Sequence, residues 1–273
     1  MAARFPIDIE YLVFTVNQGR YGIPCSDVVS VMDMPACTTV PHMPADTRGV
    51  IAFREGNIPL VDLRVCFGAQ ARSEETEALV TTMGLRKQDH VNWLNKLKDE
   101  VYNDKPITVQ TDHHKCAFGK WFDQFQSDNI NLAAYVHRFD KPHQEIHRVA
   151  IEANELIRND QSKQARELIQ RTETGVLLRL IELFDGVAEQ VRKYLLEYAI
   201  ILQVEGELFA VAVDDINFFS RLTHIEHPLP AGSATHDSGF VQALGRYRED
   251  TESSAVEKDV LLLDMSMISL QAV

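Results

Sequence analysis

The sequence is poor in the features that mark several large classes of protein. Its 27 basic and 40 acidic residues give a net charge of −13 at pH 7, and no cluster of lysine and arginine offers a surface for nucleic acid or an anionic membrane. The longest apolar run, around residues 199–202, is far shorter than the roughly 18 residues that a membrane-spanning helix needs. The first residues lack the charged start and apolar stretch of a signal peptide. We therefore expect a cytoplasmic protein that neither binds nucleic acid nor inserts into a membrane.

Cysteine is scarce, and the common catalytic motifs are missing. The 273 residues include four cysteines and no Cys-x-x-Cys pair, which argues against a disulfide framework and for reduced thiols. There is no Gly-rich phosphate loop, no His-Glu-x-x-His motif and no Gly-x-Ser-x-Gly motif. Hydrophobic residues make up 45% of the chain and charged residues 25%, as is usual for a folded domain. These features predict a folded protein that is not an enzyme.

The pattern of residues changes along the chain from one typical of strands to one typical of helices, and then back. Short β-branched and aromatic segments separated by turns fill residues 9–68 and return from residue 198 onward, as is typical of β-strands. Between them, residues 74–196 contain only four glycines and two prolines, and apolar residues recur every three to four positions. These stripes, with a shorter helix near Cys116, predict a four-helix bundle. We expect an α+β multidomain chain in which a bundle (73–197) interrupts a β domain (1–72 and 198–273).

Two details of the second β segment follow from the same patterns. Residues 199–204 and 208–213 predict a hairpin, and residues 260–265 predict a late strand. The charged stretch 248–258 lacks an apolar alternation, so we expect an exposed loop there. The acidic pair Asp214-Asp215 is expected to be solvated.

Histidine is concentrated in the helical segment. Six of the ten histidines lie between positions 90 and 147. His143 and His147 are four residues apart, so they project from one helix face, and that face is the apolar stripe. His90 lies in the stripe of its own helix. Burying three imidazoles is costly unless each finds a partner, and one metal ion could serve all three.

Cys116 completes a possible set of metal ligands. Three imidazoles and one thiolate form a tetrahedral set that suits zinc. Four protein ligands leave no open position for an activated water, which argues against a hydrolase. The alternative is that the histidines are core residues bonded to backbone carbonyls. His113 and His114 could support the ligands or replace a lost one, and His137, six residues before His143, points elsewhere on its helix.

Three short motifs in this segment resemble the chemoreceptor zinc-binding (CZB) domain. They are His90-x-x-Trp93, Cys116-x-Phe118-Gly119-x-Trp121 and His143-x-x-x-His147, with 25 residues between the first pair of ligands and 26 between the second. The resemblance covers roughly residues 75–196. It implies a four-helix bundle with Zn²⁺ on His90, Cys116, His143 and His147. It also implies a regulatory role, in which the zinc-bound thiolate senses zinc or oxidants such as hypochlorous acid.

The flanking strands resemble the chemotaxis coupling protein CheW. Residues 48–54, 58–68, 207–216 and 261–264 carry this resemblance. It implies two small SH3-like β-barrels side by side. It also implies a scaffold that links chemoreceptors to a CheA-type histidine kinase and catalyses nothing. Two positions depart from the family pattern: Ala52 stands where asparagine is common, and Glu55-Gly56 replaces a glycine directly after Arg54.

The two resemblances together predict a cytoplasmic chemosensory adaptor whose scaffold is interrupted by a zinc-binding sensor bundle. The expected cofactor is Zn²⁺, and the expected partners are chemoreceptors and a CheA-type kinase. Self-association is a further outcome that the sequence allows. The alternative is a scaffold in which the zinc is purely structural and senses nothing.

Overall fold

The chain folds into two compact units, each described here by itself. The structure, a computed structural model, describes residues 5–127, 129–226, 239–250 and 255–268. The sheet unit consists of Met1–Glu74 together with Leu196–Val273, and the helical unit consists of Glu75–Leu195. The helical unit is therefore one continuous segment between the two parts of the sheet unit.

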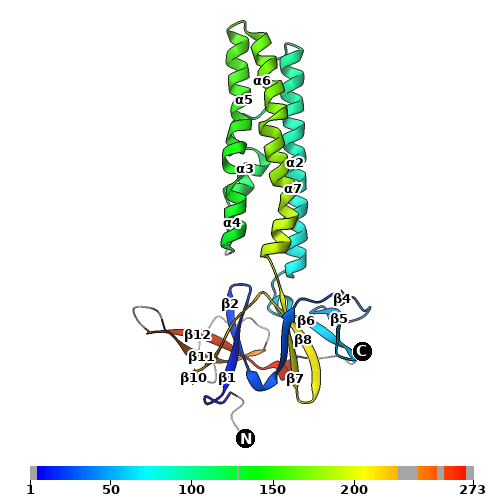
Figure 1. The fold of residues 1–273 in the computed structure, drawn as a ribbon, viewed down its shortest axis with the longest axis vertical. Coiled ribbons are helices and arrows are strands. Elements are labelled where there is room, and N and C mark those ends of the chain that lie inside the picture. The colour runs from blue at the N-terminus through cyan, green and yellow to red at the C-terminus, as the bar shows by residue number, and fades with distance from the viewer. Residues whose placement is uncertain (1–4, 128, 227–238, 251–254, 269–273) are drawn as a thin grey trace. The chain divides into compact units, whose positions relative to one another are not determined.

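The sheet unit contains two six-stranded mixed sheets (Figure 1). The first sheet has the order β10-β11-β12-β2-β1-β9, with β1 (Glu10–Val16), β2 (Gly19–Pro24), β9 (Asp215–Arg221), β10 (His224–Glu226), β11 (Val241–Asp250) and β12 (Ala255–Leu263). The second has the order β3-β7-β8-β6-β5-β4, with β3 (Val28–Asp33), β4 (Cys37–Thr38), β5 (Thr47–Phe53), β6 (Gly56–Asp62), β7 (Tyr198–Val204) and β8 (Glu207–Val213). In each sheet a strand from before the helical unit pairs in parallel with one from after it, β2 with β12 and β6 with β8.

Local sequence and long-range packing both shape these strands. Asn17 and Gln18 have φ angles of 45° and 68°, and they form the two-residue turn between β1 and β2, a geometry that matches the twist of a hairpin. Phe14 on β1 is fully buried in a cluster with Ile200 and Val211, which come from after the helical unit. Because both chain segments supply this core, neither segment can bury its apolar face alone.

The helical unit is built from long helices together with the shorter α3 and α4 (Figure 1). Its elements are α2 (Arg72–Tyr102), α3 (Ala117–Phe122), α4 (Ile130–His137), α5 (Asp140–Arg158), α6 (Ser162–Thr174) and α7 (Val176–Tyr194). The remaining short helix, α1 (Leu63–Cys66), belongs to the sheet unit. Helix α5 packs against α6 and α7, and ion pairs join α2 to α6 (Lys98–Glu173) and to α7 (Lys87–Asp185).

The predicted fold class is confirmed, with differences in detail. The chain combines two mixed β-sheets with a helical bundle. The segment between α2 and α4, where the prediction has one of its four helices, is mostly irregular. Only the six residues of α3 are helical among its described residues. The predicted stripes also break into shorter helices near Phe139 and at Gly175. Within the described residues, no helix is long and apolar enough to cross a membrane.

Two expectations about the second β segment were wrong. Residues 248–250 and 255–258 lie in β11 and β12, where Arg248 pairs with Glu257 across the hairpin, and residues 251–254 lie outside the described part of the chain. The side chain of Asp214 is only 7% exposed and forms ion pairs with Arg64 and Arg72, whereas Asp215 is exposed as expected. The expected hairpin is present as β7 and β8, and the late strand is present as the end of β12.

Candidate metal centre

The helices α2 and α5 bring three histidines to one point in the core of the helical unit. His90 lies on α2, and His143 and His147 lie one turn apart on α5. All three are at most 3% exposed. Their ring centroids are 5.1 Å apart for His90–His143, 5.8 Å for His90–His147 and 4.9 Å for His143–His147. The apolar stripes of the two helices thus carry these imidazoles into the same small volume.

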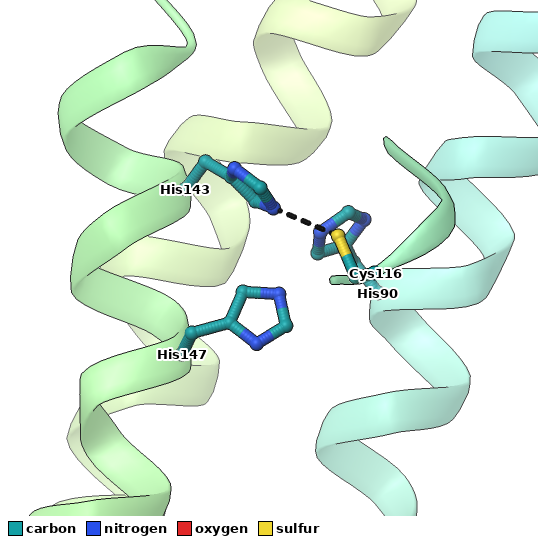
Figure 2. Close-up of side chains that lie close together, drawn as sticks. All are labelled: His90, Cys116, His143 and His147. Atoms are coloured by element: carbon teal, nitrogen blue, oxygen red, sulfur yellow. Dashed lines mark hydrogen bonds between the residues drawn. The ribbon is translucent and has the colours of Figure 1, made fainter. Parts of the chain in front are cut away.

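Cys116 approaches the histidines from the segment before α3, where it is the N-cap residue (Figure 2). Its Sγ lies 3.2 Å from Nε2 of His143 and accepts a hydrogen bond of 3.1 Å from the backbone N–H of Gly119. Gly119 is needed here, because a Cβ at this position would lie 1.8 Å from the carbonyl oxygen of His113. The close approach of residue 113 to α3 therefore helps to hold the thiol against the cluster.

One ligand atom from each of these four residues lies within 4.8 Å of the others. Nδ1 of His90 lies 2.7 Å from the carbonyl oxygen of Arg86, and Nδ1 of His147 lies 2.8 Å from that of Gln110. Since a carbonyl only accepts, each Nδ1 donates its proton, and each Nε2 keeps a free lone pair. The Nε2 atoms of His90 and His147 are buried without a hydrogen-bond partner.

This pattern fits a zinc ion. Metal-binding histidines commonly donate one ring N–H to a backbone carbonyl while the other nitrogen binds the metal. Three imidazoles and one thiol are a donor set that zinc prefers. The two buried Nε2 atoms would otherwise carry the cost of polar groups left without a partner. The residues present therefore fit a tetrahedral Zn²⁺ site.

Burial controls the charge state of the cluster. It lowers the pKa of His143 to about 2 and that of His147 to about 4, and it lowers the pKa of His90 as well. These imidazoles are therefore neutral at physiological pH, which is the form that binds a metal. Burial raises the pKa of the Cys116 thiol, so without a cation nearby this group stays protonated.

Aromatic side chains enclose the cluster and orient it. The ring of Phe118 meets the ring of His143 edge-on at 4.8 Å, and Phe184 lies 5.7 Å from the ring of His90. The indole N–H of Trp93 donates to the carbonyl of Gln110, 2.8 Å away, which is the same oxygen that accepts from His147. Trp93 thereby fixes the acceptor that orients His147.

The structure brings together all four residues that the sequence predicted as ligands, and it places the remaining histidines of the segment at or beyond the edge of this cluster. His113 is half-buried near His143, with the two rings 5.7 Å apart. His114 is exposed and pairs with Asp123, and His137 is exposed on α4. Sequence reasoning missed the carbonyls of Arg86 and Gln110. Every residue has a backbone carbonyl, so no residue type in the sequence could have marked these two.

Comparisons with known proteins place two families on the chain. A family model described as the CheW-like domain matches residues 10–89, and one described as the chemoreceptor zinc-binding domain matches residues 90–154. The chemotaxis protein CheW of Klebsiella aerogenes is 33% identical over 79 residues, which are 28% of this chain and 48% of that protein. The chain thus spans about half the length of this curated relative. The crystal structure of the scaffolding protein TtCheW from Thermoanaerobacter tengcongensis aligns over 94% of this chain and 88% of that chain, at 13% identity and a TM-score of 0.41.

The first family match covers mainly the strand-rich segment of the chain, and the second lies within the helical segment. The first covers the strands β1 to β6 and ends inside α2. The second begins at His90 and includes Cys116, His143 and His147. The predicted resemblances are confirmed: the chain carries a CheW-like domain, followed by a chemoreceptor zinc-binding domain.

Proposed function

We propose that this chain is a cytoplasmic, non-enzymatic chemosensory adaptor that couples chemoreceptors to a CheA-type histidine kinase. The CheW-like match and the chemotaxis relative support this role. The strands that follow the helical unit belong to the same two sheets as the matched ones. Residues 198–273 would therefore be the second part of one CheW-like domain (with 1–72), and residues 73–197 would be a zinc-binding bundle inserted into it.

The helical unit would hold Zn²⁺ through His90, Cys116, His143 and His147. The observation that carries this proposal is the convergence of three buried imidazoles on one thiol, with two Nε2 atoms left without a partner. Bound zinc would stabilise Cys116 as a thiolate, whose sulfur is a good nucleophile. Four protein ligands would close the coordination shell, which suits a structural or regulatory site rather than a hydrolytic one.

Cys116 would be the group that senses an oxidant. It is half-buried, whereas the three histidines are almost completely buried. Its thiolate would attack the chlorine of hypochlorous acid and release hydroxide, and water would then displace chloride to leave a sulfenic acid and a proton. A sulfenic acid is a poorer ligand than a thiolate, so oxidation would weaken the bond between zinc and Cys116. Helix α3, which follows Cys116, would then be held less firmly against the cluster.

The two junctions between the units could pass such a change to the scaffold. Arg72, the first residue of α2, still belongs to the sheet unit, where it pairs with Asp214 at 3.0 Å. Glu197, just after the helical unit, binds both terminal guanidinium nitrogens of Arg48, whose Nε lies 2.6 Å from Asp62. Each end of the insertion is thus tied to a partly buried ion pair that a shift in the helices would strain.

The alternative is that zinc only stabilises the bundle, and the closed shell of four core ligands also suits this role. The two readings differ in the metal-free protein. A sensor must keep a folded bundle in both of its states, whereas a purely structural zinc site couples metal binding to folding of the bundle as one event. Far-ultraviolet circular dichroism of the metal-free protein separates the two, since only the structural reading expects loss of the helices.

Reconstitution of signalling tests the adaptor role. A CheA-type kinase and a chemoreceptor signalling fragment are combined with the full-length chain, and autophosphorylation of the kinase is followed. We expect the chain to support receptor-dependent control of the kinase, and we expect hypochlorous acid to change that control in wild-type protein but not in Cys116→Ala. A Cys37→Ser variant, which removes an exposed cysteine, is the matched control and should respond like wild type. Failure of the chain to bind either partner would overturn the adaptor role.

A further inference from the structure

His113 and His114 are sequence neighbours with different surroundings. Nδ1 of His114 lies 3.0 Å from both carboxylate oxygens of Asp123, and its side chain is 60% exposed. The imidazole of His113 is half-buried and makes no hydrogen bond within the described part of the chain. Its ring instead meets the ring of His143 edge-on, with the centroids 5.7 Å apart. The two rings lie side by side, with centroids 4.0 Å apart, but His114 is held by Asp123, whereas His113 faces His143 at the margin of the cluster.

The distance between His113 and His143 is that of two ligands sharing one metal ion. With a Zn–N bond of about 2.0–2.1 Å and tetrahedral angles, the centroids of two imidazoles on one zinc lie roughly 5 Å apart. The three histidine pairs of the cluster are 4.9 to 5.8 Å apart. The pair of His113 and His143 falls within this range, so with respect to His143 the ring of His113 already lies at the separation of two ligands of one zinc ion.

His113 also lies on the side of the cluster from which the thiol comes. The Sγ of Cys116 contacts Nε2 of His143 at 3.2 Å and the carbonyl oxygen of His113 at 3.3 Å. Both residues belong to one short segment before α3, which turns between Asp112 and Lys115. A shift of this segment that withdraws the sulfur can therefore bring the imidazole forward.

We propose that His113 is a reserve zinc ligand that occupies the place of Cys116 when the thiolate is lost. The inference rests on the proposed zinc site. In this arrangement His90, His143, His147 and His113 form a four-nitrogen set, and the segment before α3 changes position while the metal stays. The bundle then has two zinc-bound states that differ in their fourth ligand. The four-nitrogen state binds more weakly, because a neutral imidazole replaces a negative thiolate opposite a divalent cation.

Metal binding by the full-length chain without its thiol ligand tests the proposal. Cys116→Ala is compared with Cys116→Ala/His113→Ala and with the matched control Cys116→Ala/His114→Ala. Zinc stoichiometry is measured after purification without chelator, and zinc affinity is measured by competition with a chromophoric chelator. We expect Cys116→Ala to keep one zinc per chain, and its affinity to fall by at least about 10-fold on loss of His113 but by less than about 2-fold on loss of His114. Equal affinities in the two double variants would overturn the proposal.

Cobalt substitution supplies a second readout that does not depend on the His113 variants folding. Co²⁺ in wild-type protein should show strong tetrahedral d–d absorption together with a thiolate-to-cobalt charge-transfer band. In Cys116→Ala the charge-transfer band should vanish while the strong d–d absorption remains, as four nitrogen ligands require. Weak absorption typical of higher coordination by water would contradict a reserve ligand. A wild-type protein that binds no metal would instead overturn the zinc site itself, so the two failures are distinguishable.

Discussion

The two units have cores that are built from different kinds of side chain. In the sheet unit, strands distant in the sequence pair directly, and the core around Phe14 and Ile200 consists mainly of aliphatic and aromatic side chains. In the helical unit, the core contains three buried imidazoles, against which a half-buried thiol lies. The first core gains its stability mainly from apolar burial, whereas the second includes buried imidazoles that need a partner.

This difference indicates which of the two units a metal ion or an oxidant would affect more strongly. Among the described residues, the sheet unit holds no cluster of side chains that could bind a metal ion. A core closed by His90, Cys116, His143 and His147 changes its stability whenever the metal or the thiol changes, because binding to the folded state alone shifts the folding equilibrium. Under the proposed function, the helical unit would supply the response and the sheet unit the scaffold.

Removal of zinc should have the largest effect, and it should destabilise the helical unit far more than the sheet unit. At free zinc about 1,000 times the dissociation constant, binding stabilises the folded helical unit by about 4 kcal/mol, and a chelator removes this contribution. Hydrogen exchange in residues 75–195 should accelerate, while the strands of the sheet unit should change by less than about 1 kcal/mol, with differences confined to the junctions at Arg72 and Glu197. Equal acceleration in both units would contradict the division, and no change at the junctions would contradict their coupling.

Asp214→Ala should destabilise the sheet unit and leave zinc binding by the helical unit unchanged. Asp214 pairs with Arg64 and Arg72 and accepts a hydrogen bond from the backbone N–H of Asn17. Its loss leaves two partly buried guanidinium groups without this partner, for a cost of about 3 kcal/mol. Denaturant unfolding followed on the sheet unit should show the loss, while zinc affinity stays at the wild-type value. Asp215→Ala, at the exposed neighbouring position, is the control and should be nearly neutral.

Acidification of the metal-free protein should also affect the helical unit first. Burial places the pKa of His143 at about 2 and of His147 at about 4, below the ordinary value, so the unfolded chain binds more protons as the pH falls. Their contribution to stability is present above about pH 6.5 and is lost below it, at about 1.4 kcal/mol per pH unit for each imidazole. Circular dichroism between pH 7 and pH 5 checks this, and a metal-free helical unit whose stability does not fall over this range would contradict it.

Gly119→Ala should have a smaller effect, again on the helical unit. The added Cβ would lie 1.8 Å from the carbonyl oxygen of His113, so α3 must shift, for a cost of about 1–3 kcal/mol. Zinc affinity should fall with it. The matched control is Gly84→Ala on α2, where a Cβ meets nothing within 4 Å, and this change should stabilise the helix by up to about 1 kcal/mol. Thermal unfolding of both variants measures the contrast, and equal effects would contradict the role of Gly119.

The sequence predicted the helical unit and its cluster well for a physical reason. Helical periodicity places His143 and His147 on one face, and a histidine in an apolar stripe must point inward. Which carbonyls accept from these rings could not be predicted, because the loop carrying Gln110 follows no periodic pattern. The alternatives for His113 and His114 likewise required the structure, because their rings lie only 4.0 Å apart and differ in what else they contact: His143 for His113 and Asp123 for His114.

The sheet unit was predicted less completely. The hairpin of β11 and β12 was missed because its charged residues pair across the strands, as Arg246 does with Asp259 and Lys258 with Glu249. Such pairing leaves no alternation of apolar and polar residues to read. The burial of Asp214 was missed because its partners, Arg64 and Arg72, lie far away in the sequence, on the other side of the insertion. Local patterns report local structure, and these contacts are not local.

Zinc content of the purified protein tests the central claim most directly. Wild-type protein and His143→Ala are purified without chelator, and metal is quantified by inductively coupled plasma mass spectrometry. The account predicts one zinc per chain in wild type and a large loss of zinc in His143→Ala, since this residue lies between Cys116 and His147 in the cluster. Wild-type protein without zinc, or His143→Ala with undiminished zinc, would contradict it.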